Sequence, residues 1–133
     1  MPYNTFYECI PGVKANSTGL ASSQYLIGKL TSTGTVVATG TALNSTSGPL
    51  GVFGVIMNKP GANEEVEFAV RGIVKAVAGT STILVGDRVA CNTTGKLTDV
   101  GTTDNVFFLG RALEATSAAN DIITIILFGS NRY

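Results

Sequence analysis

The chain has 133 residues, which suits one domain with its own hydrophobic core and requires neither a metal nor a disulfide for folding. Only 14% of the residues are charged and no two of the nine basic residues are adjacent, which argues against direct nucleic-acid binding because phosphate contacts need clustered Lys and Arg. The sequence contains no histidine, so it lacks the usual general base and the usual partner of cysteine in zinc sites, and we predict no enzyme activity.

The first 23 residues show no sustained hydrophobic period. They nevertheless carry four side chains that a solvated tail does not need: Tyr3, Phe6, Tyr7 and Ile10. We interpret residues 1–23 as an extended N-terminal arm whose apolar side chains contact the domain itself or a neighbouring molecule. A first edge strand packed on its own domain is the alternative. The opening sequence has neither a basic start nor an apolar core, so we do not expect a signal peptide.

Residues 24–133 are predicted to form a β-rich domain, because short runs of β-branched and aromatic residues alternate with turn sequences. The clearest strand covers residues 64–72, where Val66 and Phe68 alternate with Glu65 and Glu67 and therefore face the core. Gly72 then interrupts the pattern before residues 73–79 continue it, which indicates a bulge or a bend.

The last predicted strand lies within residues 121–129 and is rich in isoleucine. Its β-branched residues favour a strand covered on both faces over a helix, and its apolar run is too short to span a bilayer. A helical turn is conceivable only in residues 111–119. We therefore predict an all-β fold, a small β-barrel or β-sandwich-like domain of about eight short strands with an extended N-terminal arm.

Residues 93–98 read TTGKLT and resemble the end of a phosphate-binding loop. That loop requires a glycine five residues before Gly95 and a hydroxyl residue after Lys96, whereas this chain has Ala90 and Leu97 at those positions. The sequence that follows cannot begin a long helix, so no helix N-terminus would face a phosphate. The segment is better explained as a hairpin turn in which Gly95 adopts a positive φ.

Other candidate chemistry is weak, and we predict no catalytic, cofactor-binding or metal-binding residues. The alternation places Glu65, Glu67 and Arg71 on an exposed face, where they are solvated side chains rather than an acid–base pair. Cys9 and Cys91 could form a disulfide, but two free thiols in a reducing cytoplasm are the favoured interpretation.

Residues 50–128 contain a series of short motifs whose order and spacing resemble one family. These are Gly72–Val74, Gly86–Val89, Gly95–Thr98, Leu109–Ala115 and Asp121–Leu127. In this order they are similar to the capsid cement or decoration proteins of tailed bacteriophages, long described as a domain of unknown function. The first 50 residues match that family less well.

The resemblance implies a β-rich structural protein on the outer surface of an icosahedral virion head. It would clamp neighbouring subunits of the major capsid protein as homotrimers, with no cofactor, nucleic acid or membrane as partner. The low charge and the hydrophobic content of 44% agree with an exposed apolar surface that contacts other molecules. A compact β-domain with a Thr/Ser/Gly surface would have the same composition. On this reading, removing residues 1–20 would leave the domain folded and weaken capsid binding.

Three other functions stay open at this point. The first is another virion or assembly module, in the tail or in head completion. The second is a small carrier or ligand-binding barrel, in which Lys96 at the hairpin tip would be the modified lysine of a lipoyl-type carrier. The third is an enzyme, which the missing histidine and the lack of a clustered site oppose.

Overall fold

The computed structural model describes residues 5–38, 52–80, 82–101 and 107–132. Within these ranges the chain forms ten β-strands and no helix, so the predicted all-β class is confirmed. No helix there has the length and apolar character that crossing a membrane would require. The strands are β1 (Phe6–Cys9), β2 (Lys14–Ala15), β3 (Ile27–Leu30), β4 (Thr35–Ala38), β5 (Val52–Ile56), β6 (Phe68–Val77), β7 (Arg88–Cys91), β8 (Leu97–Asp99), β9 (Phe107–Ala112) and β10 (Ile122–Arg132).

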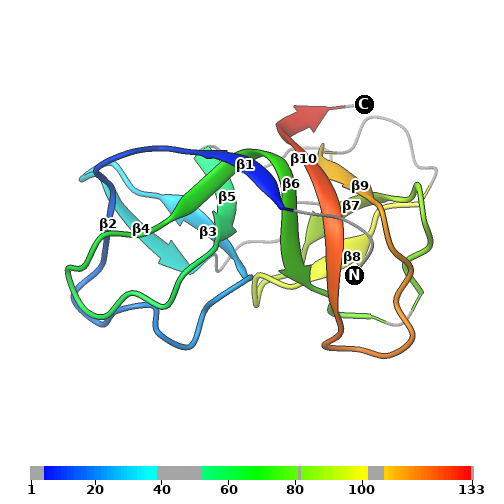
Figure 1. The fold of residues 1–133 in the computed structure, drawn as a ribbon, viewed down its shortest axis with the longest axis horizontal. Helices are drawn as coiled ribbons and strands as arrows, with labels where there is room; N and C mark the ends of the chain where they lie inside the picture. Colours follow the sequence, from blue (N-terminus) through cyan, green and yellow to red (C-terminus); the bar gives the residue numbers. More distant parts are fainter. Residues whose placement is uncertain (1–4, 39–51, 81, 102–106, 133) are drawn as a thin grey trace.

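The strands belong to one mixed sheet in the order β2-β4-β3-β5-β6-β10-β9-β7-β8, with β1 paired to β6 off this path. β2 and β4 are parallel, whereas the other strand pairs are antiparallel. The sheet is not closed, and it bends into a small β-sandwich-like domain. Figure 1 shows β1, β6 and β10 in the middle, with β2–β5 on one side and β7–β9 on the other.

β6 is the strand that joins the two halves. One of its edges pairs first with β5, at Phe68 and Ala69, and then with β10, from Gly72 to Val77. β1 covers the opposite edge, where Tyr7 lies across from Gly72. Gly72 has a φ of +114°, and a Cβ atom there would lie 2.7 Å from the Cα of Tyr7. The bend that the sequence predicted at Gly72 therefore exists, and glycine is needed both for the backbone angle and for the close approach of β1.

Among the described residues, most of the buried apolar side chains fall into two clusters. The larger one lies between β3, β5, the second half of β6 and β7–β10. The smaller one contains Val66 and Phe68, as the alternation predicted, together with Val13, Ala15, Leu20, Val36 and Ile56. The alternation Glu65, Glu67, Ala69 would place Ala69 on the exposed face. Ala69 is instead fully buried, because its side chain packs in the larger cluster.

β10 differs from the prediction of a strand covered on both faces. Ile123, Ile125 and Leu127 face the larger cluster and are buried. Ile122 and Phe128, on alternate positions, are 50% and 41% exposed. The continuous run of apolar residues therefore combines one core face with one partly open face, which periodicity alone does not distinguish from a fully covered strand.

The N-terminal residues pack on their own domain through β1, β2 and the buried Val13, Ala15 and Leu20. Packing on their own domain is compatible with both interpretations of the N-terminal residues, the extended arm and the first edge strand. The expected hairpin between β7 and β8 is confirmed, and Gly95 in its turn has a φ of +80°. Residues 111–119, the one segment considered for a helical turn, contain no helix.

Candidate docking surface

The outward face of β1, β6 and β10 carries an apolar row. Phe6 lies opposite Ile73, and Ile73 lies opposite Ile126 on the other side. Residues directly opposite each other in antiparallel strands point to the same face, so these three side chains are neighbours. Phe6 is 84% exposed, and Ile122 and Phe128 on the same strand face are also exposed. This concentration of exposed apolar side chains on paired strands is typical of a contact surface rather than of a solvated one.

Charged side chains surround this row. Glu8 lies opposite Arg71, so the two share the face of Phe6. Lys75 lies opposite Thr124 on the same face, and Arg111 lies opposite Ile126. The outward face therefore presents three cations and one carboxylate around an apolar centre.

On the opposite side of β1, which carries Tyr7, a hydrogen bond anchors the strand. The Tyr7 hydroxyl donates to a carboxylate oxygen of Glu67, a residue that precedes β6. This hydrogen bond, together with partial burial and the negative charge of Glu67, raises the pKa of Tyr7 to about 12. Burial also raises the pKa of the Cys9 thiol, and the charge of Glu67 adds to that effect. The bond fixes β1 against the segment before β6, so the backbone that carries Phe6 is anchored.

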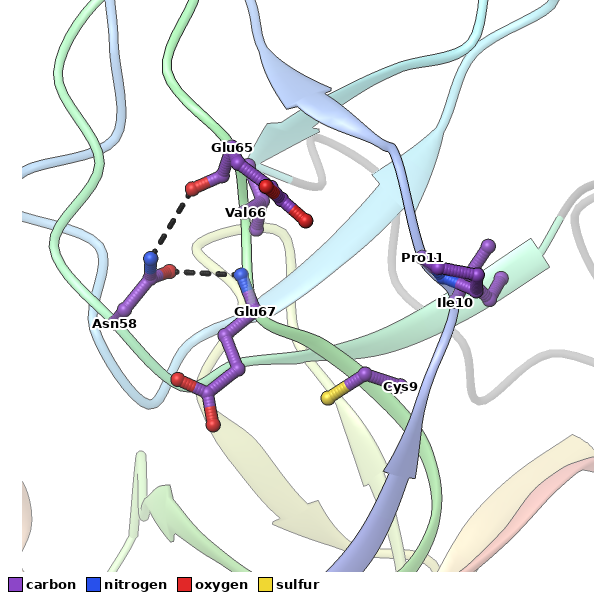
Figure 2. A pocket seen from close by; sticks show the side chains of 7 residues that line it. All are labelled: Cys9, Ile10, Pro11, Asn58, Glu65, Val66 and Glu67. Carbon is purple, nitrogen blue, oxygen red and sulfur yellow. Dashed lines mark hydrogen bonds between the residues drawn. The ribbon is translucent and has the colours of Figure 1, made fainter.

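A groove of ≈ 430 Å³ opens on this side of β1 (Figure 2). Cys9 at the end of β1 lines it together with Ile10 and Pro11, which follow the strand. Glu65, Val66 and Glu67 line it from the chain before β6. Figure 2 shows Asn58 at one end, where its amide donates to the carbonyl of Glu65 (3.1 Å) and accepts from the N–H of Glu67 (3.0 Å). These bonds occupy the backbone of the Glu65–Glu67 segment, so the groove offers an apolar floor and a carboxylate rim rather than a strand edge.

A second exposed apolar feature lies in the turn between β6 and β7. Leu84 and Val85 are 62% and 66% exposed. The turn is nevertheless fixed: the Leu84 N–H donates to the Asp87 carboxylate (2.8 Å), and the Asp87 N–H donates back to the Leu84 carbonyl (3.1 Å). Arg111 donates to the carbonyl of Gly86 (2.8 Å). The hydrogen-bonded turn therefore keeps the side chains of Leu84 and Val85 exposed to solvent.

The described residues give little support to the chemical alternatives. Cys9 is exposed, Cys91 is buried and neither forms a disulfide. The Lys96 ammonium donates to the side-chain oxygen of Asn120 (2.7 Å), whereas the lysine of a carrier domain must be free to be modified. In the part of the chain described, no three metal-ligating side chains come together. Asp121 stabilises a turn: it accepts from the backbone N–H groups of Ser117 and Ala118, which lower its pKa.

The four side chains that the sequence assigned to the arm occupy different environments. Phe6 is exposed on the outward face, Tyr7 is half-buried, and Ile10 packs against the smaller cluster. Tyr3 lies outside the described residues. Sequence reasoning missed Leu84 and Val85, because two adjacent aliphatic residues before a turn have the same pattern as the end of a core strand.

Comparison with known proteins identifies the family. The family model of the phage cement protein matches residues 21–127, which is most of the chain. Among curated proteins no match is found. The matched region contains the strands from β3 onward, the Leu84–Val85 turn and most of the outward face. The chain therefore belongs to the phage cement protein family and is a structural protein associated with the phage capsid.

Proposed function

We propose that this protein decorates the outer surface of a tailed-phage head and clamps neighbouring subunits of the major capsid protein, as trimers. The observation that carries the proposal is the family match over residues 21–127. The exposed apolar side chains on fixed strands and turns support it, because a structural protein of this kind acts through contact surfaces. No catalytic role is proposed.

The clamp would stabilise the head by linkage. A protein that binds the assembled shell but not its separated subunits favours assembly by mass action. A trimer that makes several contacts at once binds far more tightly than one protomer, because the later contacts form at a high effective concentration. Modest contacts per protomer are therefore sufficient.

We assign the shell contact to the turn that carries Leu84 and Val85. Its hydrogen bonds fix the backbone that carries the two side chains, so little backbone entropy is lost on binding. Burial of an exposed aliphatic side chain by a partner contributes about 1.5–3 kcal/mol.

The direct test of decoration is co-sedimentation of the purified protein with expanded, undecorated heads. Saturable binding of many copies per head is expected. Binding of only a few copies would favour a tail or head-completion module, and an absence of binding to cognate heads would contradict the proposal.

The intact mass of the protein tests the carrier alternative, in which Lys96 would be covalently modified. The Lys96–Asn120 hydrogen bond is unfavourable for that alternative.

The structure changes how the N-terminal residues should be tested. The sequence predicted that a deletion of residues 1–20 leaves the domain folded. Val13, Ala15 and Leu20 are buried in the smaller cluster, so that deletion would remove core side chains as well as contact side chains. Single substitutions at exposed positions such as Phe6 are therefore the appropriate test.

A further inference from the structure

The Phe6 side chain is exposed although its strand is fixed in the sheet. Its strand β1 is paired with β6 and anchored by the Tyr7–Glu67 hydrogen bond, yet the Phe6 side chain is 84% exposed. A large aromatic side chain on a fixed strand gains most from a partner that buries it. Phe6 therefore has the character of a preformed anchor.

The groove beside β1 has the complementary character. Its floor contains Ile10, Pro11 and the buried Val66. The groove is open to solvent, and its volume of ≈ 430 Å³ leaves room for an aromatic ring.

Phe6 cannot enter the groove of its own chain. Successive side chains of a strand point to opposite faces, so Phe6 and Glu8 share one side of β1 while Tyr7 takes the other. The Tyr7 hydroxyl donates a hydrogen bond to Glu67, which lines the groove. The groove therefore lies on the Tyr7 side of β1, opposite to the side that carries Phe6. An aromatic ring that fills the groove must come from another molecule.

The charges beside the two features are complementary. Arg71 and Lys75 lie on the face of Phe6 together with Glu8. The groove has Glu65 and Glu67 on its rim, and Lys14 lies opposite Glu65. The face of Phe6, which also carries Arg111, thus has an excess of positive charge, and the rim of the groove has an excess of negative charge, which favours contact between the two sides.

We propose that Phe6 of one copy inserts into the groove of a second copy, with Arg71 and Lys75 facing Glu65 and Glu67. This inference rests on the proposed function, for which it supplies the contact between protomers. Because the anchor and the groove are different surfaces, the contact is head-to-tail and can be repeated by a third copy until a ring closes.

Sedimentation velocity of the full chain tests this contact with two variants. Phe6→Asp removes the anchor and keeps the groove, whereas Glu65→Arg blocks the groove and keeps the anchor. We expect the wild-type chain to associate and each variant alone to sediment as a monomer of 13.7 kDa. An equimolar mixture should form a heterodimer and nothing larger, because only one matched pair of surfaces remains.

Val52→Asp and Glu64→Arg are the controls. They introduce the same new residues, Asp and Arg, at exposed positions that do not line the groove.

A cross-link gives a second, independent measurement. Cys9 lines the groove and is exposed, so Phe6→Cys should form a disulfide with Cys9 of the next copy when diamide oxidises the two thiols. Within one strand, positions 6 and 9 are about 10 Å apart, which is too far for a disulfide within one chain. The cross-link should disappear in Phe6→Cys/Cys9→Ser and should not form in Val52→Cys.

Three results would overturn the inference: a monomeric wild-type chain at 200 µM, variants that associate like the wild type, or a mixture that stays monomeric. Binding to heads is measured separately by co-sedimentation. A chain that decorates heads but shows any of these three results would retain the proposed function and lose the head-to-tail contact.

Discussion

At the level of single residues, Gly72 has a conformation that other residues rarely adopt. Its φ is +114°, and the backbone of β1 passes close to where a Cβ atom would be. Because the glycine side chain is a single hydrogen atom, β6 can bend at this position and β1 can pair with it. Gly34 differs in a useful way, since its φ is +80° but no atom lies within 4 Å of its Cβ position.

We expect Gly72→Ala to reduce the free energy of unfolding by about 3 kcal/mol or more. Left-handed strain costs about 1–2 kcal/mol, and overpacking against β1 adds about 1–3 kcal/mol. Gly34→Ala should show the strain alone, about 1–2 kcal/mol. Urea unfolding of the two variants measures the difference. Equal losses would show that the close approach of β1 contributes nothing to stability.

Tyr7 gives a prediction about pH. Its pKa of about 12 in the folded chain exceeds the ordinary value of 10.0, because the phenol donates to Glu67. A raised pKa contributes stability that is fully present below pH 10 and is lost as the pH rises through about 12. The melting temperature of the wild-type chain should therefore fall more steeply between these pH values than that of Tyr7→Phe. Parallel curves would contradict the role of the hydrogen bond.

At the level of elements, the alternating strand around Val66 and Phe68 and the hairpin turn at Gly95 follow from local pattern and turn chemistry. The position of β1 does not, because its partner β6 is about sixty residues away and pairing depends on the whole fold. Ala69 was misassigned for a related reason: it is buried in the larger cluster, whose other members come from strands that are distant in the sequence. Within the contact surface, Phe6 could be predicted from the sequence, because it is a large apolar residue in a segment without hydrophobic periodicity.

The turn between β6 and β7 is the element that we assign to the shell. Leu84→Asp or Val85→Asp should raise the dissociation constant for heads by about 10-fold or more, since burying an aliphatic side chain contributes about 1.5–3 kcal/mol. The melting temperature of the free protein should change little, because both side chains are exposed. Co-sedimentation measures the affinity, and Val52→Asp is the matched exposed control. An unchanged affinity in both turn variants would exclude the turn from the contact.

At the level of the whole molecule, the low charge and the exposed apolar surfaces have a common explanation. Only 14% of residues are charged, yet apolar side chains are exposed on β1, on β10 and in the turn between β6 and β7. The outward face of β1 and β10 and the turn between β6 and β7 are separate parts of the domain, which would let one protomer contact the shell and its neighbours at the same time. Such an arrangement suits a clamp, whose strength comes from the number of contacts made at once.

Calorimetric melting of expanded heads, with and without the protein, measures directly whether its binding stabilises the head. We expect the melting temperature of the head to rise and to saturate with occupancy, and to rise less for Leu84→Asp at equal total protein. Heads that bind the protein to saturation and melt at an unchanged temperature would rule out stabilisation by the protein, because a ligand specific for the assembled shell must stabilise it.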